Sequence, residues 1–214
     1  LSAFASWVGY DLDGRTDIKW TFSFVVRVKE KIAALADIRE RFLALKGLLG
    51  EDSEMVRLSR QVTGKLDLAI AAAEGQVQAL ERVGKNGYTL ADAANVITQG
   101  DGHNLTSAEP ILALLDQVIA ATESAKAKVA VASIAGLFRA TGLGMSHIHV
   151  RVNAVQINNA FRAFVHESWT RDLSERQALA RIVDMIHSVR PETVNFETLD
   201  LENATAIRQF ALAA

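Results

Sequence analysis

Apolar residues recur every three to four positions along most of this chain, and only two prolines interrupt the pattern, Pro110 and Pro191. This spacing places apolar side chains on one face of an α-helix, whereas a half-buried strand requires strict alternation. Proline removes a backbone donor, so its scarcity leaves room for long helices. We therefore expect a predominantly α fold, built of long antiparallel helices with one or two short strands.

The first two helices are expected to be long. The spacing predicts one helix from about residue 17 to residue 47, with Gly47 as the residue that follows its last turn. A second helix is predicted to begin at Asp52 or Ser53, since either side chain can accept a hydrogen bond from the first turn. The link between them is only a few residues long, which predicts that the two helices pack antiparallel.

Capping residues predict two shorter helices in the middle of the chain. Thr89 followed by Asp92 is typical of a helix start, because each side chain can bond to the backbone N–H of the other. Thr106 or Ser107 ahead of Pro110 predicts a second start, since proline in a first turn costs no helical hydrogen bond.

From residue 143 the apolar pattern alternates. His147, His149 and Arg151 share one face of a strand that is predicted over residues 143–152. A guanidinium on that face suits a phosphate or a carboxylate. Two histidines at strand spacing also suit zinc, although no third ligand is evident in the sequence. A basic strand face paired with acidic helices is a further interpretation.

A loop rich in glycine and aspartate precedes the first long helix. It reads SWVGYDLDGRT over residues 6–16. The Asp-x-Asp-Gly pattern resembles a calcium loop, but an EF-hand requires an oxygen ligand where Arg15 stands and a bidentate glutamate where Phe22 stands. An alternative interpretation is a turn whose aspartates cap the helix that follows.

The chain is expected to be one central segment of a larger protein. It begins with Leu and ends in FALAA, which is typical of a helix interior, so we expect both ends to be cut. The predicted parts are a loop with a short strand over 1–16, a helical region over 17–141, a strand over 143–152 and helices over 154–214.

Composition argues against several classes of partner. The chain has 23 basic and 25 acidic residues and a net charge of −2, so no strong field attracts nucleic acid or an anionic membrane. The longest apolar run, from Val129 to Phe138, is about half of what a bilayer crossing needs. The absence of cysteine fits a reducing compartment, and we expect a cytoplasmic protein with neither nucleic acid nor a membrane as its partner.

The loop and the strand together resemble the middle region of phosphoenolpyruvate carboxylase. In that family a Ser-Trp-x-Gly-Gly-Asp-Arg-Asp-Gly-Asn-Pro loop is followed, after a long helical stretch, by a Phe-Gly-Leu-x-Leu-x-x-Leu-Asp-Ile-Arg-Gln strand. Here these read SWVGYDLDGRT and TGLGMSHIHVRV, in the family's order and at a similar separation. The resemblance implies a fold that is an excerpt of a helix-rich (β/α) barrel.

The resemblance also implies an activity. Members of the family join phosphoenolpyruvate and bicarbonate to form oxaloacetate and phosphate, using Mg²⁺ or Mn²⁺. It implies these two substrates as partners of the full-length protein, and a homo-oligomer, because family members are often tetramers. The family's His-Pro-Thr motif, metal carboxylates and glycine-rich arginine loop have no counterpart in this chain. We therefore expect the chain by itself to be inactive and to hold no metal.

Five residues match the family's binding residues. Arg151 matches the strand arginine that contacts the phosphoenolpyruvate or carboxyphosphate oxygens, and is the candidate catalytic residue. Trp7 matches the loop tryptophan beside the bicarbonate pocket. Asp11, Asp13 and Gly14 match the two aspartates and the glycine of that loop.

The sequence departs from the family pattern at several positions. Leu12 replaces the loop arginine, Tyr10 replaces the second glycine, and Val152 replaces the strand glutamine. An alternative function is a non-catalytic helical domain, related to the carboxylase, that senses an anion or binds a protein. An unrelated helical interaction protein is the remaining interpretation.

Overall fold

The computed structural model describes residues 5–6, 20–50, 52–98, 102–144, 147–148, 154–155, 159 and 180. Within these residues the chain is predominantly helical, as the apolar spacing predicts. The chain divides into two compact units, one of residues 1–6 and 24–148 and the other of residues 7–23 and 149–214. Nearly all of the described residues belong to the first unit.

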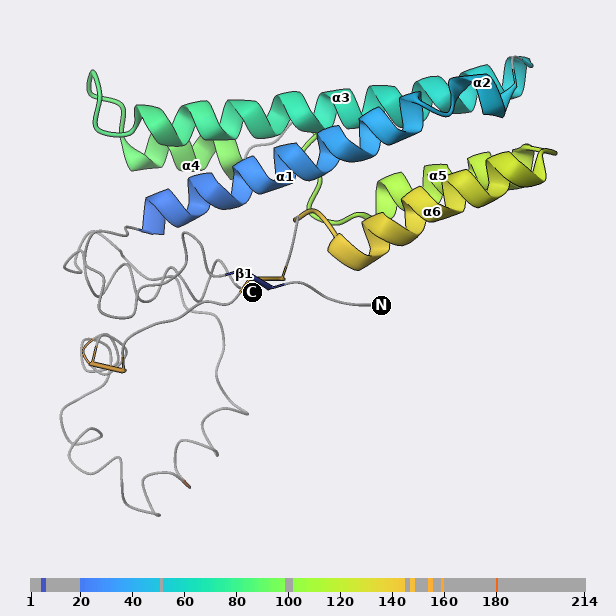
Figure 1. Ribbon diagram of the computed structural model, residues 1–214. Coiled ribbons are helices and arrows are strands. Elements are labelled where there is room, and N and C mark those ends of the chain that lie inside the picture. The colour runs from blue at the N-terminus through green and yellow to red at the C-terminus, as the bar shows by residue number, and fades with distance from the viewer. Residues whose placement is uncertain are drawn as a thin grey trace. The chain divides into compact units, whose positions relative to one another are not determined.

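Helices account for most of the described chain, and two short strands accompany them (Figure 1). The helices are α1 (Trp20–Leu43), α2 (Lys46–Leu49), α3 (Ser53–Arg82), α4 (Leu90–Thr98), α5 (Glu109–Ala121) and α6 (Ala125–Thr141). The strands are β1 (Ala5–Ser6) and β2 (His147–Ile148). No helix among the described residues is long and apolar enough to cross a membrane.

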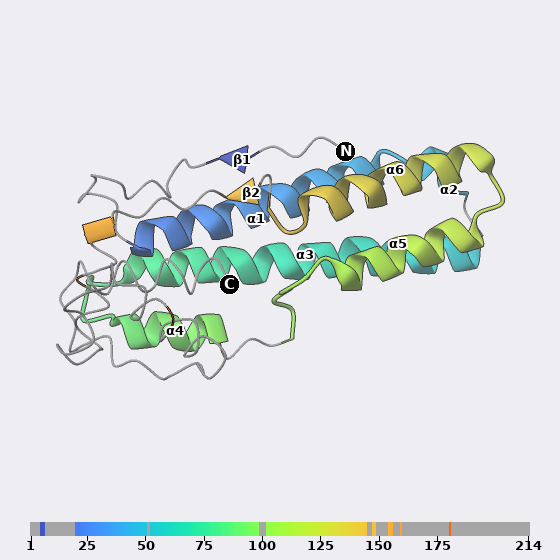
Figure 2. The same ribbon diagram turned by 90° about the horizontal axis from the view of Figure 1, so that it is seen from below.

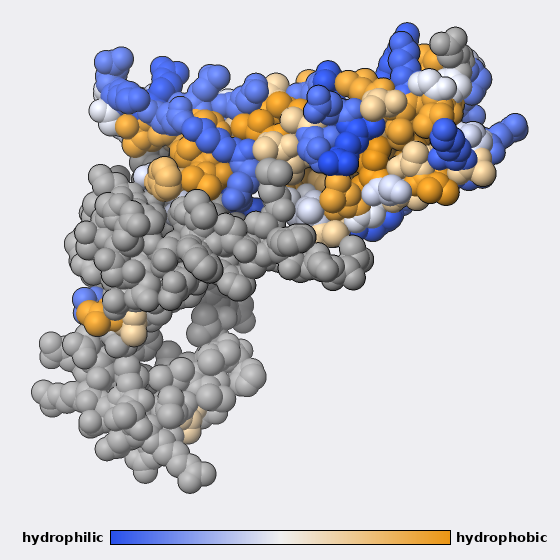
Figure 3. Space-filling model, in the orientation of Figure 1, coloured by the Kyte–Doolittle hydropathy of each residue, from blue (hydrophilic) through white to orange (hydrophobic). Residues whose placement is uncertain are grey.

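The long helices α1 and α3 lie antiparallel, as predicted (Figures 1 and 2). Lys29 in the first half of α1 pairs with Glu81 at the end of α3 at 2.7 Å, and Arg39 further along α1 pairs with Asp67 earlier in α3. These pairs are exposed, so they add little to stability. They show that the two helices run in opposite directions, because a residue early in α1 meets one late in α3. Figure 3 shows hydrophilic side chains spread over the bundle, with apolar patches between them.

The helices α1, α3, α5 and α6 pack as a bundle around one apolar core (Figure 2). A link of three residues joins α5 to α6, so these helices are antiparallel neighbours, and Arg139 of α6 pairs with Asp116 of α5 at 3.0 Å. All four helices contribute to the core, whose large side chains each contribute about 1.5–3 kcal/mol when buried. The largest of them are Leu35, Ile38, Phe42, Met55, Leu58, Leu66, Ile111, Leu115 and Phe138.

Two predicted helix starts are confirmed by their caps. The Asp52 carboxylate accepts a hydrogen bond from the Met55 N–H at 2.9 Å, so α3 begins where the sequence predicts. At α4 the Thr89 N–H donates to Asp92 at 2.7 Å, and the Asp92 N–H donates to the Thr89 hydroxyl at 3.2 Å. This reciprocal pair is the predicted capping box.

The predicted end of the first helix is wrong. The spacing predicts Gly47 as the residue after that helix, but α1 ends at Leu43 and Gly47 lies inside the short helix α2. The left-handed residue that leads toward α3 is Gly50, with φ 85°. The additional turn places Leu49 in the core, and burial of this side chain favours α2 over a direct link.

The predicted cap of α5 is also wrong, although its proline is where the sequence predicts. The residue before α5 is Ala108, and no side chain of Thr106 or Ser107 caps the helix. Ala108 occupies the capping position and packs against the core, so this position has an apolar contact in place of a capping hydroxyl. Pro110 lies in the first turn, where its missing N–H costs nothing.

The predicted helices after residue 154 fall largely outside the described residues. Residues 154, 155, 159 and 180 are helical. The other residues of the range 154–214, and all of the range 1–16 apart from residues 5 and 6, are not among the described residues.

Candidate functional site

The strands β1 and β2 pair in parallel, and they come from distant parts of the sequence. Ala5 lies opposite His147, and Ser6 lies opposite Ile148. Ser6 is the first residue of the SWVGYDLDGRT loop motif, and His147 is the first histidine of the alternating segment. The pairing therefore joins the first residue of the loop motif to the middle of the TGLGMSHIHVRV motif.

The predicted site residues follow these strands in the sequence. Trp7, Asp11, Asp13 and Gly14 come after β1, and Arg151 comes three residues after β2. All five lie outside the residues that the structure describes. In a parallel pair the carboxyl ends of both strands lie at the same edge.

The turn between α6 and β2 differs from the prediction. The sequence predicts a strand from residue 143, but Gly142 ends α6 with φ 61°, and residues 142–144 form a turn. The Gly142 N–H donates to the Phe138 carbonyl at 2.8 Å, and the Gly144 N–H donates to the Thr141 carbonyl at 3.3 Å. These bonds satisfy carbonyls of the last helical turn, so residues 142–144 are not part of a strand, whereas residues 147 and 148 form β2.

Arg27 of α1 packs against this turn. A Cβ at Gly144 would lie 3.0 Å from Cζ and 3.2 Å from Nη2 of Arg27, and closer still to Nη1. The absence of a side chain at this buried glycine therefore lets the guanidinium lie against the backbone. The cation is beside the carboxyl end of α6, where the helix dipole favours positive charge, and it also pairs with Glu30 at 3.4 Å. Nothing in the local spacing around Arg27 signals this contact.

Lys31 ties α1 to the connection between α4 and α5. Its ammonium donates to the Asn104 side-chain oxygen at 2.7 Å and to the Leu105 carbonyl at 2.6 Å. Burial lowers the pKa of this amine below its usual 10.5, because the charged form loses hydration. Its two acceptors are neutral groups of the fold, which identifies Lys31 as a structural link.

The described residues contain no cluster of metal-binding side chains. Among them, no group of three or more His, Cys, Asp and Glu side chains lies close enough to hold a metal ion. The zinc interpretation concerns His147 and His149, and the calcium interpretation concerns Asp11 and Asp13. The side chains of all four lie outside the described set, so both interpretations stay predictions.

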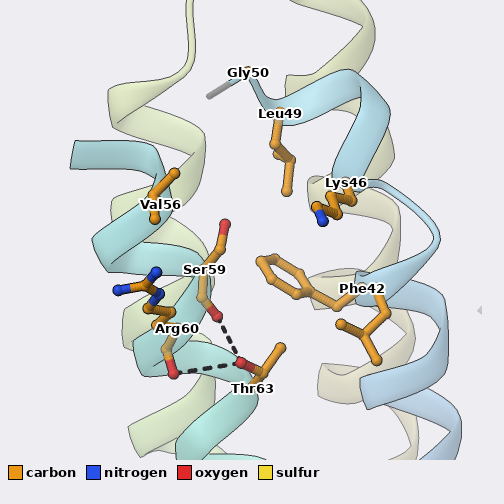
Figure 4. A pocket seen from close by; sticks show the side chains of 9 residues that line it. Phe42, Lys46, Leu49, Gly50, Val56, Ser59, Arg60 and Thr63 are labelled. Atoms are coloured by element: carbon orange, nitrogen blue, oxygen red, sulfur yellow. Dashed lines mark hydrogen bonds between the residues drawn. The ribbon is translucent and has the colours of Figure 1, made fainter. Parts of the chain in front are cut away.

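A cavity of about 520 Å³ opens at the junction of α1, α2 and α3 (Figure 4). This junction cavity has a size typical of small-molecule sites. Apolar and polar side chains both line it, and they come from all three helices. They are Phe42, Leu43, Lys46, Leu49, Val56, Ser59, Arg60 and Thr63, with Gly50 at the link. No local sequence pattern predicts this cavity, because it forms where α2 interrupts the predicted single helix.

Comparison with known proteins identifies no relative. No protein-family model matches the chain, and neither the curated proteins nor the solved structures contain a match to it. The motifs in the sequence and the geometry of the described residues are therefore the basis for a functional assignment.

Proposed function

We propose that the chain is the central segment of a phosphoenolpyruvate carboxylase, an excerpt of a helix-rich (β/α) barrel that carries part of one anion-binding site. The observation that supports this most directly is the parallel pairing of β1 with β2. Ligands of parallel sheets and barrels bind at the carboxyl ends of the strands. The SWVGYDLDGRT motif extends from the carboxyl end of β1, and Arg151 follows the carboxyl end of β2 in the sequence.

The chemistry explains why an arginine is needed. Phosphoryl transfer from phosphoenolpyruvate to bicarbonate gives carboxyphosphate and the enolate of pyruvate. The enolate carbon then takes up the carboxyl group and phosphate leaves, so negative charge moves between oxygens throughout. Arg151 offers five N–H donors in a rigid fork, which suits the oxygens of carboxyphosphate, and fixed donors stabilise charge that develops in a transition state.

The remaining parts of the site are divided between the loop motif of this chain and segments that the chain does not contain. The resemblance assigns Trp7 to the border of the bicarbonate pocket, and Asp11, Asp13 and Gly14 to the loop beside it. Mg²⁺ or Mn²⁺, bound by carboxylates elsewhere in the full-length protein, would neutralise charge on the phosphoryl oxygens. The isolated chain therefore has one substrate-binding arginine without a metal or a base, and we expect it to be inactive.

A second candidate is a related helical domain that binds an anion without catalysing carboxylation. Leu12 favours it, because an aliphatic side chain replaces the arginine of the family's loop. The two candidates share Arg151 as an anion ligand and differ in turnover. The rest of the gene distinguishes them, since an intact His-Pro-Thr motif and downstream metal carboxylates are required only by the enzyme.

Oxaloacetate formation by the full-length protein tests the proposal. The product is coupled to NADH oxidation through malate dehydrogenase, with phosphoenolpyruvate, bicarbonate and Mg²⁺ supplied. We expect Arg151→Ala to lower kcat by about 100-fold or more, because an oriented donor to the developing charge is lost. Arg139→Ala is the matched control, since its exposed ion pair with Asp116 lies on the bundle and its loss should leave kcat unchanged.

Three results would count against this proposal. An inactive full-length protein that still binds phosphoenolpyruvate would favour the second candidate. Unchanged turnover in Arg151→Ala would show that the arginine is not in the site. Equal losses in Arg151→Ala and Arg139→Ala would indicate damage to the fold instead of a role in catalysis.

A further inference from the structure

We propose that the junction cavity binds a small amphipathic carboxylate, a molecule with an aliphatic or aromatic body and one anionic end. The cavity is lined by residues of α1, α2 and α3. The helix α2 joins α1 to α3 at one end of the bundle (Figure 1). All of the cavity's described lining residues belong to the first unit, and binding at this cavity is independent of the carboxylase assignment.

The inner wall of the junction cavity is apolar. Phe42 points from α1 toward α3, and Leu49 enters the same space from α2 (Figure 4). Both side chains are buried, whereas Val56 on the α3 side is half-buried. An apolar ligand body that covers these side chains leaves water, which is the main favourable term in binding of this kind.

Two polar groups on opposite sides of the cavity are available to an anion. Lys46 projects from α2 and Ser59 from α3 (Figure 4). Lys46 forms no ion pair with any described residue. An ammonium and a hydroxyl that converge on one oxygen-bearing group form charge-assisted hydrogen bonds, which are stronger than neutral ones.

The Ser59 hydroxyl lacks the hydrogen bond to the preceding helical turn that other helical hydroxyls of the described residues form. Thr63 donates its hydroxyl hydrogen to the Ser59 carbonyl at 3.0 Å, and Ser133 in α6 donates to the Val129 carbonyl at 2.8 Å. These bonds to the preceding turn are the usual arrangement for a helical Ser or Thr. The described residues provide no such bond for the Ser59 hydroxyl, so its hydrogen is available to a ligand.

Charge around the cavity favours an anion over a neutral molecule. The described lining has two basic side chains, Lys46 and Arg60, and no acidic one. The Arg60 guanidinium points away from the cavity in Figure 4, so we assign the contact with the anion to Lys46. Asp52 lies near Gly50 at the rim; one of its oxygens accepts the hydrogen bond that caps α3, and its negative charge offsets one of the two basic side chains. The described part of the lining therefore has a net positive charge.

Matched probes separate the charged end from the apolar body. Octanoate carries both features, 1-octanol carries the apolar body without the charge, and acetate carries the charge without the body. We expect calorimetry on the full chain to show binding of octanoate, with 1-octanol weaker by about fivefold or more, and no detectable binding of acetate.

Substitutions locate the binding. Lys46→Met keeps the length of the side chain and should weaken octanoate binding by about fivefold, while binding of 1-octanol stays unchanged. Ser59→Ala should weaken octanoate binding by about two- to threefold. Lys85→Met is the matched control, because this exposed lysine lies beyond the opposite end of α3. The substitution should leave the affinity for both octanoate and 1-octanol unchanged.

Three binding results would contradict the proposed carboxylate site. Absence of octanoate binding, equal binding of octanoate and 1-octanol, or unchanged affinity in Lys46→Met would each overturn it. Val56→Trp fills the cavity and should abolish binding of both octanoate and 1-octanol, with helical content checked by circular dichroism. If that variant does not fold, the comparison of Lys46→Met with Lys85→Met still decides, because both lysines are exposed and neither packs in the core.

Discussion

At Gly144 the missing side chain allows a contact between two segments that are far apart in the sequence. Arg27 reaches from α1 to the turn after α6, and its guanidinium occupies the space that a Cβ would fill. The contact holds the turn from which the chain leads toward β2. Because the obstacle to a side chain is the far end of a partly exposed arginine, substitution should displace Arg27 more readily than the backbone.

Gly144→Ala should therefore be a mild change whose cost depends on Arg27. We expect the free energy of unfolding in urea to fall by less than about 1 kcal/mol, because the guanidinium moves and its contact is lost. In an Arg27→Ala background the added methyl group meets no obstacle, and the same change should be neutral or slightly stabilising, since alanine restricts the unfolded chain. A double-mutant cycle should then give a coupling energy of about 0.5 kcal/mol or more. Additive effects would show that the two residues do not interact.

At the scale of elements, the best predicted features are the starts of helices. Asp52 at α3 and the pair of Thr89 and Asp92 at α4 act within one turn, so the short sequence around them contains the whole signal. The break between α1 and α2 contains no such signal. It depends on Leu49 reaching a core that residues of α3, α5 and α6 also build, and a local pattern does not report contacts of that range.

The cap of α4 should depend on pH. The Thr89 backbone N–H and hydroxyl donate to Asp92 and lower the pKa of this carboxyl below its usual 3.8. Because the folded pKa lies below the unfolded one, the contribution is fully present above the unfolded value and is lost as pH falls through the folded value. We expect the first turn of α4 to open as pH falls through the lowered pKa of Asp92, as measured by the Thr89 amide shift in NMR.

Two variants check that assignment. Asp92→Asn should remove the acid transition of the Thr89 amide, since the amide side chain does not titrate. Asp116→Asn changes an exposed carboxylate on α5 and should leave the transition in place. A Thr89 amide that titrates in the ordinary aspartate range, or does so equally in Asp92→Asn, would contradict the cap.

At the scale of the whole molecule, helical spacing predicts the class of fold but not how its parts meet. The sequence predicts long antiparallel helices, and α1 with α3 confirms them, because spacing and a short link are sufficient for that conclusion. The junction cavity and the Arg27 contact arise only after the bundle is assembled. Trp7 and Arg151, which are central to the carboxylase proposal, lie outside the described residues and stay predictions.

One shared core predicts that the bundle unfolds as a unit. Phe138 of α6 is 0% exposed and belongs to a cluster that includes side chains of α1, α3 and α5. Phe138→Ala removes most of a buried ring and leaves a cavity, which should lower the free energy of unfolding by about 3–5 kcal/mol. Because the four helices share these contacts, we expect one cooperative urea transition, with amides of α1 and α3 destabilised together with those of α6.

Val129→Ala provides the control within the same helix. Val129 is 68% exposed, so its truncation removes little buried surface and should change stability by less than about 0.5 kcal/mol. Both variants shorten an apolar side chain of α6, but only Phe138 is buried. A difference between the two variants in the hydrogen exchange of each helix therefore reports the effect of losing a buried side chain. Exchange that accelerates in α5 and α6 but not in α1 and α3 after Phe138→Ala would show that the two pairs of helices open separately. The core would then be two adjoining cores, and the bundle would not be a single cooperative unit.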